Sequence, residues 1–364
     1  MARPFCILKS TKPDPVTMDE KIFKAYDIRG VVPDQMDGEF AFLLGRSYAT
    51  MRQKELPGKR MTIAVGGDMR LSTPDLKSKL IEGLTESGAD VVDVGLVSTP
   101  TFYFSVAFYH YDGGIQVSAS HNPKEYNGFK MVRARGVPVS RDTGMDELKT
   151  LVQSRQFLQA EGKGKVTQSR DILVDEVREE SVGIDQASIR PLTIVVDAAN
   201  AMGALDIETM FQGLPCKLIK LNFDLDGTFP VHQPDPLDEK NLKIIQDAVH
   251  EHHADLGIAP DGDGDRYFFI DDKGDIIRQE ILRGIMAQLA LKEHPGATVC
   301  YDIRPGRITR EMIEEAGGHA VVTPVGHSLI KEVMIRENAV FGGESSGHYF
   351  YQFSFGTFEA PIRL

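Results

Sequence analysis

Three aspartates on alternate residues form the stretch of this chain that is best suited to chemistry. Asp261, Asp263 and Asp265 are separated by glycines and followed by Arg266. The glycines let the backbone curl, so the three carboxylates can converge. Carboxylates held this close repel one another unless a cation compensates them. Because all the ligands are oxygens, the pattern favours Mg²⁺ or Ca²⁺ over zinc, with Arg266 placed to hold a phosphate against the metal.

The same residues also test other interpretations of this stretch. An EF-hand loop that starts at Asp261 needs glycine at its sixth position and glutamate at its twelfth. Those positions hold Arg266 and Asp272, so an EF-hand is excluded. An aspartyl-phosphate phosphatase would use Asp261 as its nucleophile after the apolar run 256–259, and this alternative stays open. A plain acidic hairpin turn is also open.

A second candidate segment is the run Ser-Ala-Ser-His-Asn-Pro at 118–123, which follows the short apolar strand expected at 114–117. The end of a strand places a hydroxyl at the rim of a sheet, where α/β proteins bind ligands. Ser120 therefore has neighbours that can hydrogen-bond phosphate oxygens, among them His121. Lys130 follows a turn and can approach the same place. An Asn-Pro turn ordered by hydroxyl groups is the structural alternative.

A third segment, the glycine-rich loop 342–348, follows the apolar run 339–341. Its Glu344 can accept hydrogen bonds from neighbouring sugar hydroxyls, and Ser346 can add another. Upstream, the run 324–327 closes a strand and opens a helix, which is a natural anion site. A mobile glycine-rich turn is the alternative for the loop.

The elements that position these segments repeat along the chain. Three times an apolar strand ends in aspartate, at Asp68, Asp197 and Asp302, and a helix, a glycine and another apolar strand follow. Such strand–helix–strand units indicate parallel or mixed sheets with helices on their faces. We therefore predict an α/β protein with three tandem, topologically similar domains, whose mixed sheets are flanked by helices. The three aspartates are expected to cap helices or order loops.

Composition shifts predict the domain boundaries. A polar, glycine-containing linker lies near residue 163, and a strand and turn at 268–276 separate the second unit from the third. The predicted division is an N-terminal extension at 1–19 and three domains at 20–163, 164–275 and 276–364. These domains carry the serine segment, the acidic segment and the glycine-rich loop, respectively.

Composition also excludes several classes of protein. The 364 residues are 41% hydrophobic and 26% charged, with a net charge of −12. This balance is typical of globular proteins and argues against nucleic-acid or anionic-membrane surfaces. Cys6, Cys216 and Cys300 form no disulfide framework, and no signal peptide or transmembrane run is apparent. We expect a cytoplasmic protein that is a monomer or a dimer and binds a small molecule.

Together these segments resemble the α-D-phosphohexomutase family, in its phosphomannomutase/phosphoglucomutase branch. The resemblance covers roughly residues 20–350, and five motifs match in the family's order. The matching motifs are FKAYDIRG at 23–30, SASHNP at 118–123 with NGFK at 127–130, DGDGDR at 261–266, GHS at 326–328 and GGESSGH at 342–348.

The resemblance implies a role for each matching residue. Ser120 is the implied phosphoserine, and its phosphate would complete a Mg²⁺ site made by Asp261, Asp263 and Asp265. Lys130 is the implied general acid/base, with His121 beside it. The implied substrate-binding residues are Tyr26, Arg29, Arg266, Arg304, Gly326, His327, Glu344 and Ser346. At position 304 some relatives carry a lysine that assists proton transfer, and arginine holds its proton too tightly for that task.

The implied reaction interconverts the 1- and 6-phosphates of mannose or glucose through a hexose 1,6-bisphosphate. Members of the family carry a fourth, C-terminal domain that grips the non-transferring phosphate, and no such loop is found after residue 348. We therefore expect a truncated form with an incomplete third domain, weak substrate binding and low mutase activity. Phosphoglucosamine mutase is an alternative within the family, although its opening motif differs from FKAYDIRG. A non-catalytic sugar-phosphate-binding module is an alternative from another class.

Overall fold

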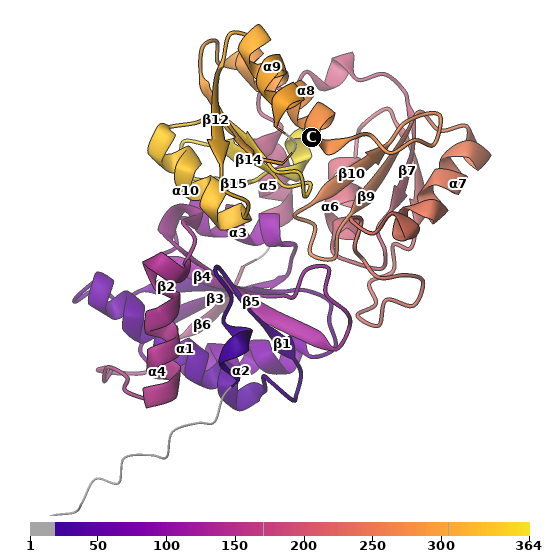
Figure 1. Ribbon diagram of the computed structural model, residues 1–364. Helices are drawn as coiled ribbons and strands as arrows, with labels where there is room; N and C mark the ends of the chain where they lie inside the picture. Colours follow the sequence, from indigo (N-terminus) through magenta and orange to yellow (C-terminus); the bar gives the residue numbers. More distant parts are fainter. Residues whose placement is uncertain (1–18, 170, 305) are drawn as a thin grey trace, which may run out of the picture.

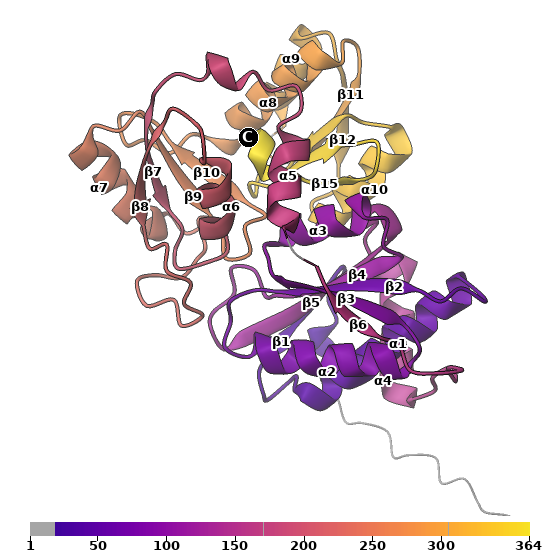
Figure 2. The same cartoon turned by 180° about the vertical axis from the view of Figure 1, so that it is seen from behind.

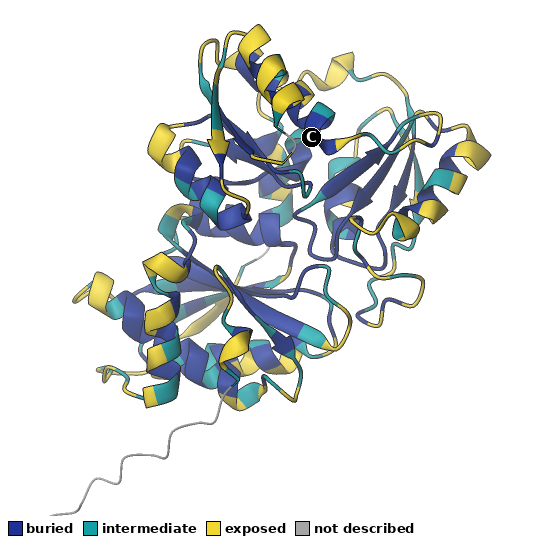
Figure 3. Ribbon diagram, viewed as in Figure 1, coloured by how far each residue is buried: buried dark blue, intermediate teal, exposed yellow. Residues whose placement is uncertain are grey.

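The computed structural model describes residues 19–364 except 170 and 305. Three α/β units follow one another along the chain, and each has its own mixed sheet flanked by helices, as the sequence predicts. Figure 1 shows the first unit at the bottom, with the second and third units side by side above it. Most residues of the sheets are buried, while exposed residues concentrate on the outer helices and on the segments that link the units (Figure 3).

The first unit has a six-stranded sheet in the order β1-β5-β4-β2-β3-β6. Its strands are β1 Ile28–Val31, β2 Thr62–Gly67, β3 Asp90–Leu96, β4 Gly113–Val117, β5 Tyr126–Arg133 and β6 Val166–Gln168. Its helices are α1 Gly38–Glu55, α2 Thr73–Glu86, α3 Thr99–Phe108 and α4 Met145–Ser154. β6 pairs in parallel with β3, so the first sheet continues beyond residue 163, where the sequence suggested a boundary.

The order of the central strands explains where the serine segment lies. β2 has β3 on one side and β4 on the other, and all three are parallel. The chain leaves β2 through α2 to reach β3, and then returns past β2 through α3 to reach β4. The loops after β2 and β4 therefore diverge at the ends of neighbouring strands, which opens the kind of crevice where α/β sheets bind ligands. The segment 118–123 directly follows β4 at this point.

The second unit has a four-stranded sheet in the order β10-β9-β7-β8. Its strands are β7 Thr193–Asp197, β8 Lys217–Leu221, β9 Leu256–Pro260 and β10 Tyr267–Ile270, and its helices are α5 Ile172–Glu180, α6 Gly203–Met210 and α7 Lys243–His252. β9 and β10 are antiparallel, and Pro260 faces Tyr267 across the pair. The acidic segment 261–266 is therefore the connection of a hairpin.

The third unit has a five-stranded sheet in the order β12-β11-β13-β14-β15. Its strands are β11 Thr298–Asp302, β12 His319–Thr323, β13 Phe341–Gly343, β14 Tyr349–Gln352 and β15 Thr357–Glu359, and its helices are α8 Gln279–Glu293, α9 Arg307–Glu315 and α10 His327–Glu337. Short 3₁₀ turns complete the chain at Glu20–Ile22, Ala134–Gly136, Arg141–Thr143, Gln186–Ser188, Glu239–Leu242 and Pro361–Arg363. No helix in the described part of the chain has both the length and the apolar character needed to cross a bilayer.

Helix α3 joins the first unit to the third. Figures 1 and 2 both place it between the first sheet and the β14–β15 hairpin. The ring of Phe104 meets those of Phe355 and Phe358 edge-on, with centroids 5.9 and 6.3 Å apart. Such aromatic pairs bury a large apolar area and prefer this geometry. The interface therefore fixes the third unit, with its glycine-rich loop, over the serine segment of the first.

Candidate active site

The hairpin loop after β9 gathers the three aspartates. Asp261, Asp263 and Asp265 are all buried, and one carboxylate oxygen of each lies within 4.8 Å of the others. The turn closes because Gly264 adopts a positive φ of 75°, which glycine tolerates without strain. The backbone N–H of Asp265 then donates to Oδ1 of Asp261 over 3.1 Å. The convergence expected from the alternating glycines is confirmed.

Ser120 lies against this loop although the two are far apart in the chain. Its Oγ donates a hydrogen bond of 2.8 Å to Oδ2 of Asp261. The backbone of Ser120 has a φ of 53°, a left-handed conformation that costs free energy for a residue with a side chain. The hydroxyl of Ser118 accepts a hydrogen bond of 3.0 Å from the Ser120 N–H and supports this conformation. The serine and acidic segments therefore form one site.

His121 places a neutral imidazole beside the serine. Its Nδ1 lies 3.0 Å from Ser120 Oγ. Burial lowers the pKa of His121 to about 2, and the nearby charges of Arg266 and Arg29 contribute. A histidine that stays neutral can accept or donate one hydrogen bond at Nδ1, according to its tautomer. His121 therefore contacts the Ser120 hydroxyl without adding a charge to the site.

Lys130 brings a positive charge to the aspartates from strand β5. Its Nζ lies 2.7 Å from Oδ2 of Asp263 and 2.5 Å from Oδ2 of Asp265. Burial alone would lower the pKa of Lys130, but the two carboxylates outweigh it and hold this pKa well above its usual range. The hydroxyl of Thr99 also donates to Asp263. Lys130 is thus an ammonium donor in this arrangement.

The charge balance of the cluster suits a divalent cation. Burial, together with Asp265 and Asp263, raises the pKa of Asp261 to about 7. Oδ1 of Asp263 is buried and has no hydrogen-bond partner among the described residues. A buried carboxylate oxygen without a partner costs free energy that a bound ion would recover. The donor set is oxygen only, which fits Mg²⁺ and does not fit a soft metal.

A cavity of about 220 Å³ opens beside the cluster. Its lining includes every residue predicted to bind substrate, namely Tyr26, Arg29, Arg266, Arg304, Gly326, His327, Glu344 and Ser346. His121, Lys130 and Asp265 also line it. All three units contribute to the lining, so the cavity is a cleft between them. The roles of these residues stay predictions, but the structure brings them to one place.

The glycine-rich loop forms the wall of the cleft that comes from the third unit. Oε1 of Glu344 accepts a hydrogen bond of 2.6 Å from the N–H of Gly326, and its Oε2 lies 3.0 Å from Nδ1 of His348. Burial would raise the pKa of Glu344, but His348 and the N–H of Gly326 outweigh burial and hold this pKa below its usual value. Ser346 Oγ lies 2.9 Å from the same imidazole nitrogen. The loop therefore presents an ionised carboxylate and a hydroxyl together.

His348 is a cleft residue that the sequence analysis missed, although it ends the quoted GGESSGH motif. Burial would lower its pKa, but Asp265 at 3.2 Å and Glu344 raise this pKa to about 9. The imidazole is therefore charged at neutral pH and joins the acidic loop to the glycine-rich loop. Leu237 also lines the cleft and was not predicted, while Val325 lies in the run 324–327 that was expected to form an anion site. Isolated apolar residues give no signal in a single sequence.

The lining of the cleft also includes an aromatic ring and two arginines. The ring of Tyr26 meets that of His327 edge-on, with centroids 4.6 Å apart. Arg29 donates to Oδ1 of Asn122 over 2.7 Å and pairs with Asp27 at the same distance. The side chain of Arg304 is 52% exposed and pairs with Asp302 at 3.1 Å. Positive groups thus surround the cleft in a chain of net negative charge, which suits an anionic ligand.

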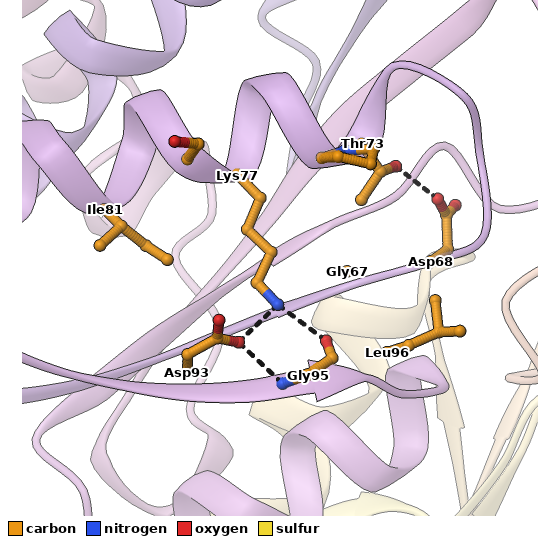
Figure 4. Close-up of a pocket in the computed structure, with 10 residues that line it drawn as sticks. Gly67, Asp68, Thr73, Lys77, Ile81, Asp93, Gly95 and Leu96 are labelled. Carbon is orange, nitrogen blue, oxygen red and sulfur yellow. Dashed lines mark hydrogen bonds and ion pairs between the residues drawn. The ribbon is translucent and has the colours of Figure 1, made fainter. Parts of the chain in front are cut away.

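A larger cavity, of about 440 Å³, lies away from this cluster, between α2 and the ends of β2 and β3. Figure 4 shows Lys77 pointing into it between Asp93 and Gly95. The Lys77 ammonium lies 2.5 Å from Oδ1 of Asp93 and donates to the carbonyl oxygen of Gly95 over 2.9 Å. Its charge is already compensated, so size alone does not make this cavity the active site.

The three strand-ending aspartates order loops, as expected. Asp68 accepts from the Thr73 hydroxyl over 2.7 Å. Asp302 accepts from the backbone N–H of Ser345 over 3.2 Å. Asp197 pairs with Nε2 of His232 at 2.9 Å, which anchors the long loop between β8 and α7.

The pair of His232 and Asp197 predicts a pH dependence of stability. Burial would lower the pKa of His232, but Asp197 and the Gln233 carbonyl raise it above its usual value. The stabilisation is then complete below about pH 6.5 and is lost as the pH rises through the folded-state pKa. Urea unfolding at several pH values should show that His232→Gln lowers the free energy of unfolding at pH 5.5 and changes it less at pH 9. A constant difference between the two proteins would contradict this.

Models of known protein families match this chain in three successive segments, one for each unit. The phosphoglucomutase/phosphomannomutase family models match domain I at residues 20–159, domain II at 172–274 and domain III at 279–359. A phosphomannomutase of Vibrio cholerae serotype O1 is 37% identical over 335 residues, which are 91% of this chain and 72% of that protein.

Solved structures share the fold. A phosphoglucomutase/phosphomannomutase family protein from Burkholderia thailandensis superposes with a TM-score of 0.88 at 34% identity, over 95% of this chain and 75% of that one. An N-acetylphosphoglucosamine mutase from Aspergillus fumigatus, in complex with GlcNAc-6P and magnesium, has a TM-score of 0.52 at 14% identity. That alignment covers 87% of this chain and 67% of the fungal chain, and at this identity it reports on the fold alone.

Proposed function

Since the chain belongs to the α-D-phosphohexomutase family, in its phosphomannomutase/phosphoglucomutase branch, we propose that it interconverts the 1- and 6-phosphates of mannose or glucose through a phosphorylated Ser120. The family acts on phosphosugars. The single observation that carries the proposal for Ser120 is the 2.8 Å contact between its hydroxyl and Asp261, next to the cationic cleft that His121 and Asp265 line.

The proposed cycle transfers the Ser120 phosphate to the free hydroxyl of a bound hexose monophosphate. A bond forms between the sugar oxygen and phosphorus while the bond between Ser120 Oγ and phosphorus breaks, which gives hexose 1,6-bisphosphate. The intermediate then turns over in the cleft, and its other phosphate returns to Ser120. In the first transfer a proton leaves the sugar hydroxyl and one joins Ser120 Oγ; in the second a proton leaves Ser120 Oγ and one joins the sugar oxygen that gives up its phosphate. Lys130 is the group that we propose for this exchange, because its ammonium can donate to the leaving oxygen.

Asp261, Asp263 and Asp265 are the residues that would hold Mg²⁺. When bound, the ion supplies positive charge that stabilises the phosphoryl oxygens during transfer. Arg29, Arg266 and Arg304 line the same cleft and can add hydrogen bonds to phosphate. The chain's own cations therefore face the charge that develops during transfer.

The sugar would be read by the glycine-rich loop. Glu344 and Ser346 present acceptors and a hydroxyl side by side, and these suit two neighbouring hydroxyls of a hexose. The substrate must bind in two flipped orientations, so a carboxylate–hydroxyl pair is better suited than a deep, shaped pocket. The oligomeric state and the cytoplasmic setting stay predictions.

The alternative of an aspartyl-phosphate phosphatase places the covalent phosphate on Asp261 instead. That carboxylate contacts Ser120 and lies within 4.8 Å of two other aspartates. A nucleophilic Asp261 would therefore also have to serve as a ligand of the metal. Phosphoglucosamine mutase remains the alternative within the family. A sugar-phosphate-binding module would retain the cleft and transfer nothing.

Intact-mass spectrometry of the purified chain after incubation with glucose 1,6-bisphosphate and Mg²⁺ tests the proposal. We expect the mass of one phosphate, stable to hydroxylamine and mapped to Ser120, and no gain when EDTA replaces Mg²⁺. A phosphate that hydroxylamine removes would indicate an acyl phosphate on Asp261 and the phosphatase alternative. No phosphate at all would favour the binding module.

A further inference from the structure

Arg70 is a fully buried arginine in the loop between β2 and α2, beneath the serine segment. Its two terminal nitrogens donate to four backbone carbonyls of the chain between residues 120 and 126. These bonds reach Ser120 over 2.7 Å, Asn122 over 2.6 Å, Pro123 over 2.7 Å and Tyr126 over 2.9 Å. Its Nε lies 3.2 Å from Oδ2 of Asp68, an ion-pair contact in which neither atom makes a hydrogen bond within the described part of the chain.

The guanidinium of Arg70 holds the serine segment and the residues after it, up to 126, through their backbone carbonyls. Buried carbonyls must find donors, and four of them find the same rigid group. Lysine offers one nitrogen on a flexible stem and cannot reproduce this planar fork. The loop also holds Ser120 in its left-handed backbone conformation. Such a conformation persists only where the surroundings over-determine it, and the four bonds from Arg70 supply that constraint.

The second unit covers the same arginine. The ring of Phe229 lies 5.1 Å from the Arg70 Cζ, which is within the range of a cation–π contact. An added Cβ at Gly227 would lie 2.7 Å from the Cα of Arg70, so the two loops touch closely. Further along that loop, Gln233 donates to the carbonyl of His121 over 2.7 Å. The carbonyl of Pro234 accepts from the N–H of Gly262 over 3.1 Å.

We propose that Arg70 is a positioning residue for phosphoryl transfer, which holds the Ser120 hydroxyl against the acidic loop by fixing the carbonyls of residues 120–126. The inference rests on the function proposed above. The terminal nitrogens of Arg70 are buried and donate to backbone carbonyls, so this role requires no contact between Arg70 and the sugar phosphate. The loss of Arg70 should therefore slow phosphate transfer and leave the binding of the sugar phosphate nearly unchanged.

Arg70→Ala tests this by single-turnover transfer of phosphate from glucose 1,6-bisphosphate to the full chain with Mg²⁺. We expect the transfer rate per folded molecule to fall about 100-fold, because a shift of 1 Å at a reacting atom has an effect of that size. The dissociation constant for glucose 6-phosphate should change less than about threefold, since an unaffected binding site keeps its affinity. Guanidinium ion at millimolar concentration should restore much of the rate by filling the vacated site.

Arg52→Ala is the matched control. Arg52 is also buried in the first unit, where it donates to the carbonyl of Asp112 over 2.8 Å on the far side from the serine loop. It should lose stability without losing transfer rate, and guanidinium should not change that rate. If Arg70→Ala does not fold, Arg70→Lys decides the question, because it keeps the charge and most of the volume.

The outcomes separate this inference from the proposed function. Transfer at the wild-type rate by a folded Arg70→Ala or Arg70→Lys variant would overturn the positioning role. An equal loss in the Arg52 control, or a loss that guanidinium does not relieve, would also overturn it. If the wild-type chain itself takes up no phosphate, the proposed function fails, whatever the variants do.

Discussion

Ser120→Ala should abolish the uptake of phosphate from glucose 1,6-bisphosphate and lower the isomerisation of hexose phosphates by at least about 10⁴-fold. The reason is that the variant removes the hydroxyl that contacts Asp261, which Ser120 presents from its left-handed turn after β4. Rapid quenching and intact-mass spectrometry measure the uptake, and a coupled assay measures isomerisation. The affinity for glucose 6-phosphate should be nearly unchanged.

Ser118→Ala is the matched control for this variant. Ser118 is also buried, and its hydroxyl accepts from the Ser120 N–H and lies 3.4 Å from Oδ2 of Asp263. The control should slow transfer by about tenfold through lost orientation, yet still accept one phosphate per chain. If Ser118→Ala took up none while Ser120→Ala remained phosphorylated, the phosphate would belong to Ser118 and the proposed role of Ser120 would be wrong.

The parts of this molecule that could be predicted from sequence are those with strong local signals. Apolar runs followed by aspartate predict the strands β2, β7 and β11, and glycine-flanked carboxylates predict the acidic loop 261–266. The serine and acidic segments each follow a strand, and α/β sheets bind ligands at strand ends, so their place at the rim of a sheet follows from the fold class. The short strand β6, which adds residues 166–168 to the first sheet, was not predicted, because three exposed residues give no pattern.

The parts that could not be predicted depend on tertiary contacts. Helix α3 is buried on nearly all sides by the first sheet and the third unit, so its apolar residues show no amphipathic period. In helix α5, Glu176 and Glu180 are buried, although their spacing is typical of a solvated face. Arg70 has the same difficulty, since an arginine before a helix gives no sign that it will bind four carbonyls. Such residues are recognised only when the units are assembled.

Gly262→Ala should lower the rate of phosphate transfer by about 10³-fold, because the preorganised acidic loop 261–266 would be displaced from Ser120. An added Cβ at Gly262 would lie 2.4 Å from the carbonyl oxygen of Ser120 and 3.0 Å from Cγ of Pro234. The first of these neighbours is backbone that Arg70 holds in place, so it cannot move aside cheaply. The acidic loop must shift instead, and the contact between Asp261 and Ser120 lengthens.

Gly162→Ala provides the control, because an added Cβ there meets nothing within 4 Å. Both variants replace one glycine by alanine, so they change the unfolded chain equally. Transfer should be lost only in Gly262→Ala, and raising the Mg²⁺ concentration should recover part of it if the displaced aspartates still converge. A folded Gly262→Ala variant with normal transfer would mean that the acidic loop need not touch the serine backbone, and the close contact of the two segments would then have no part in catalysis.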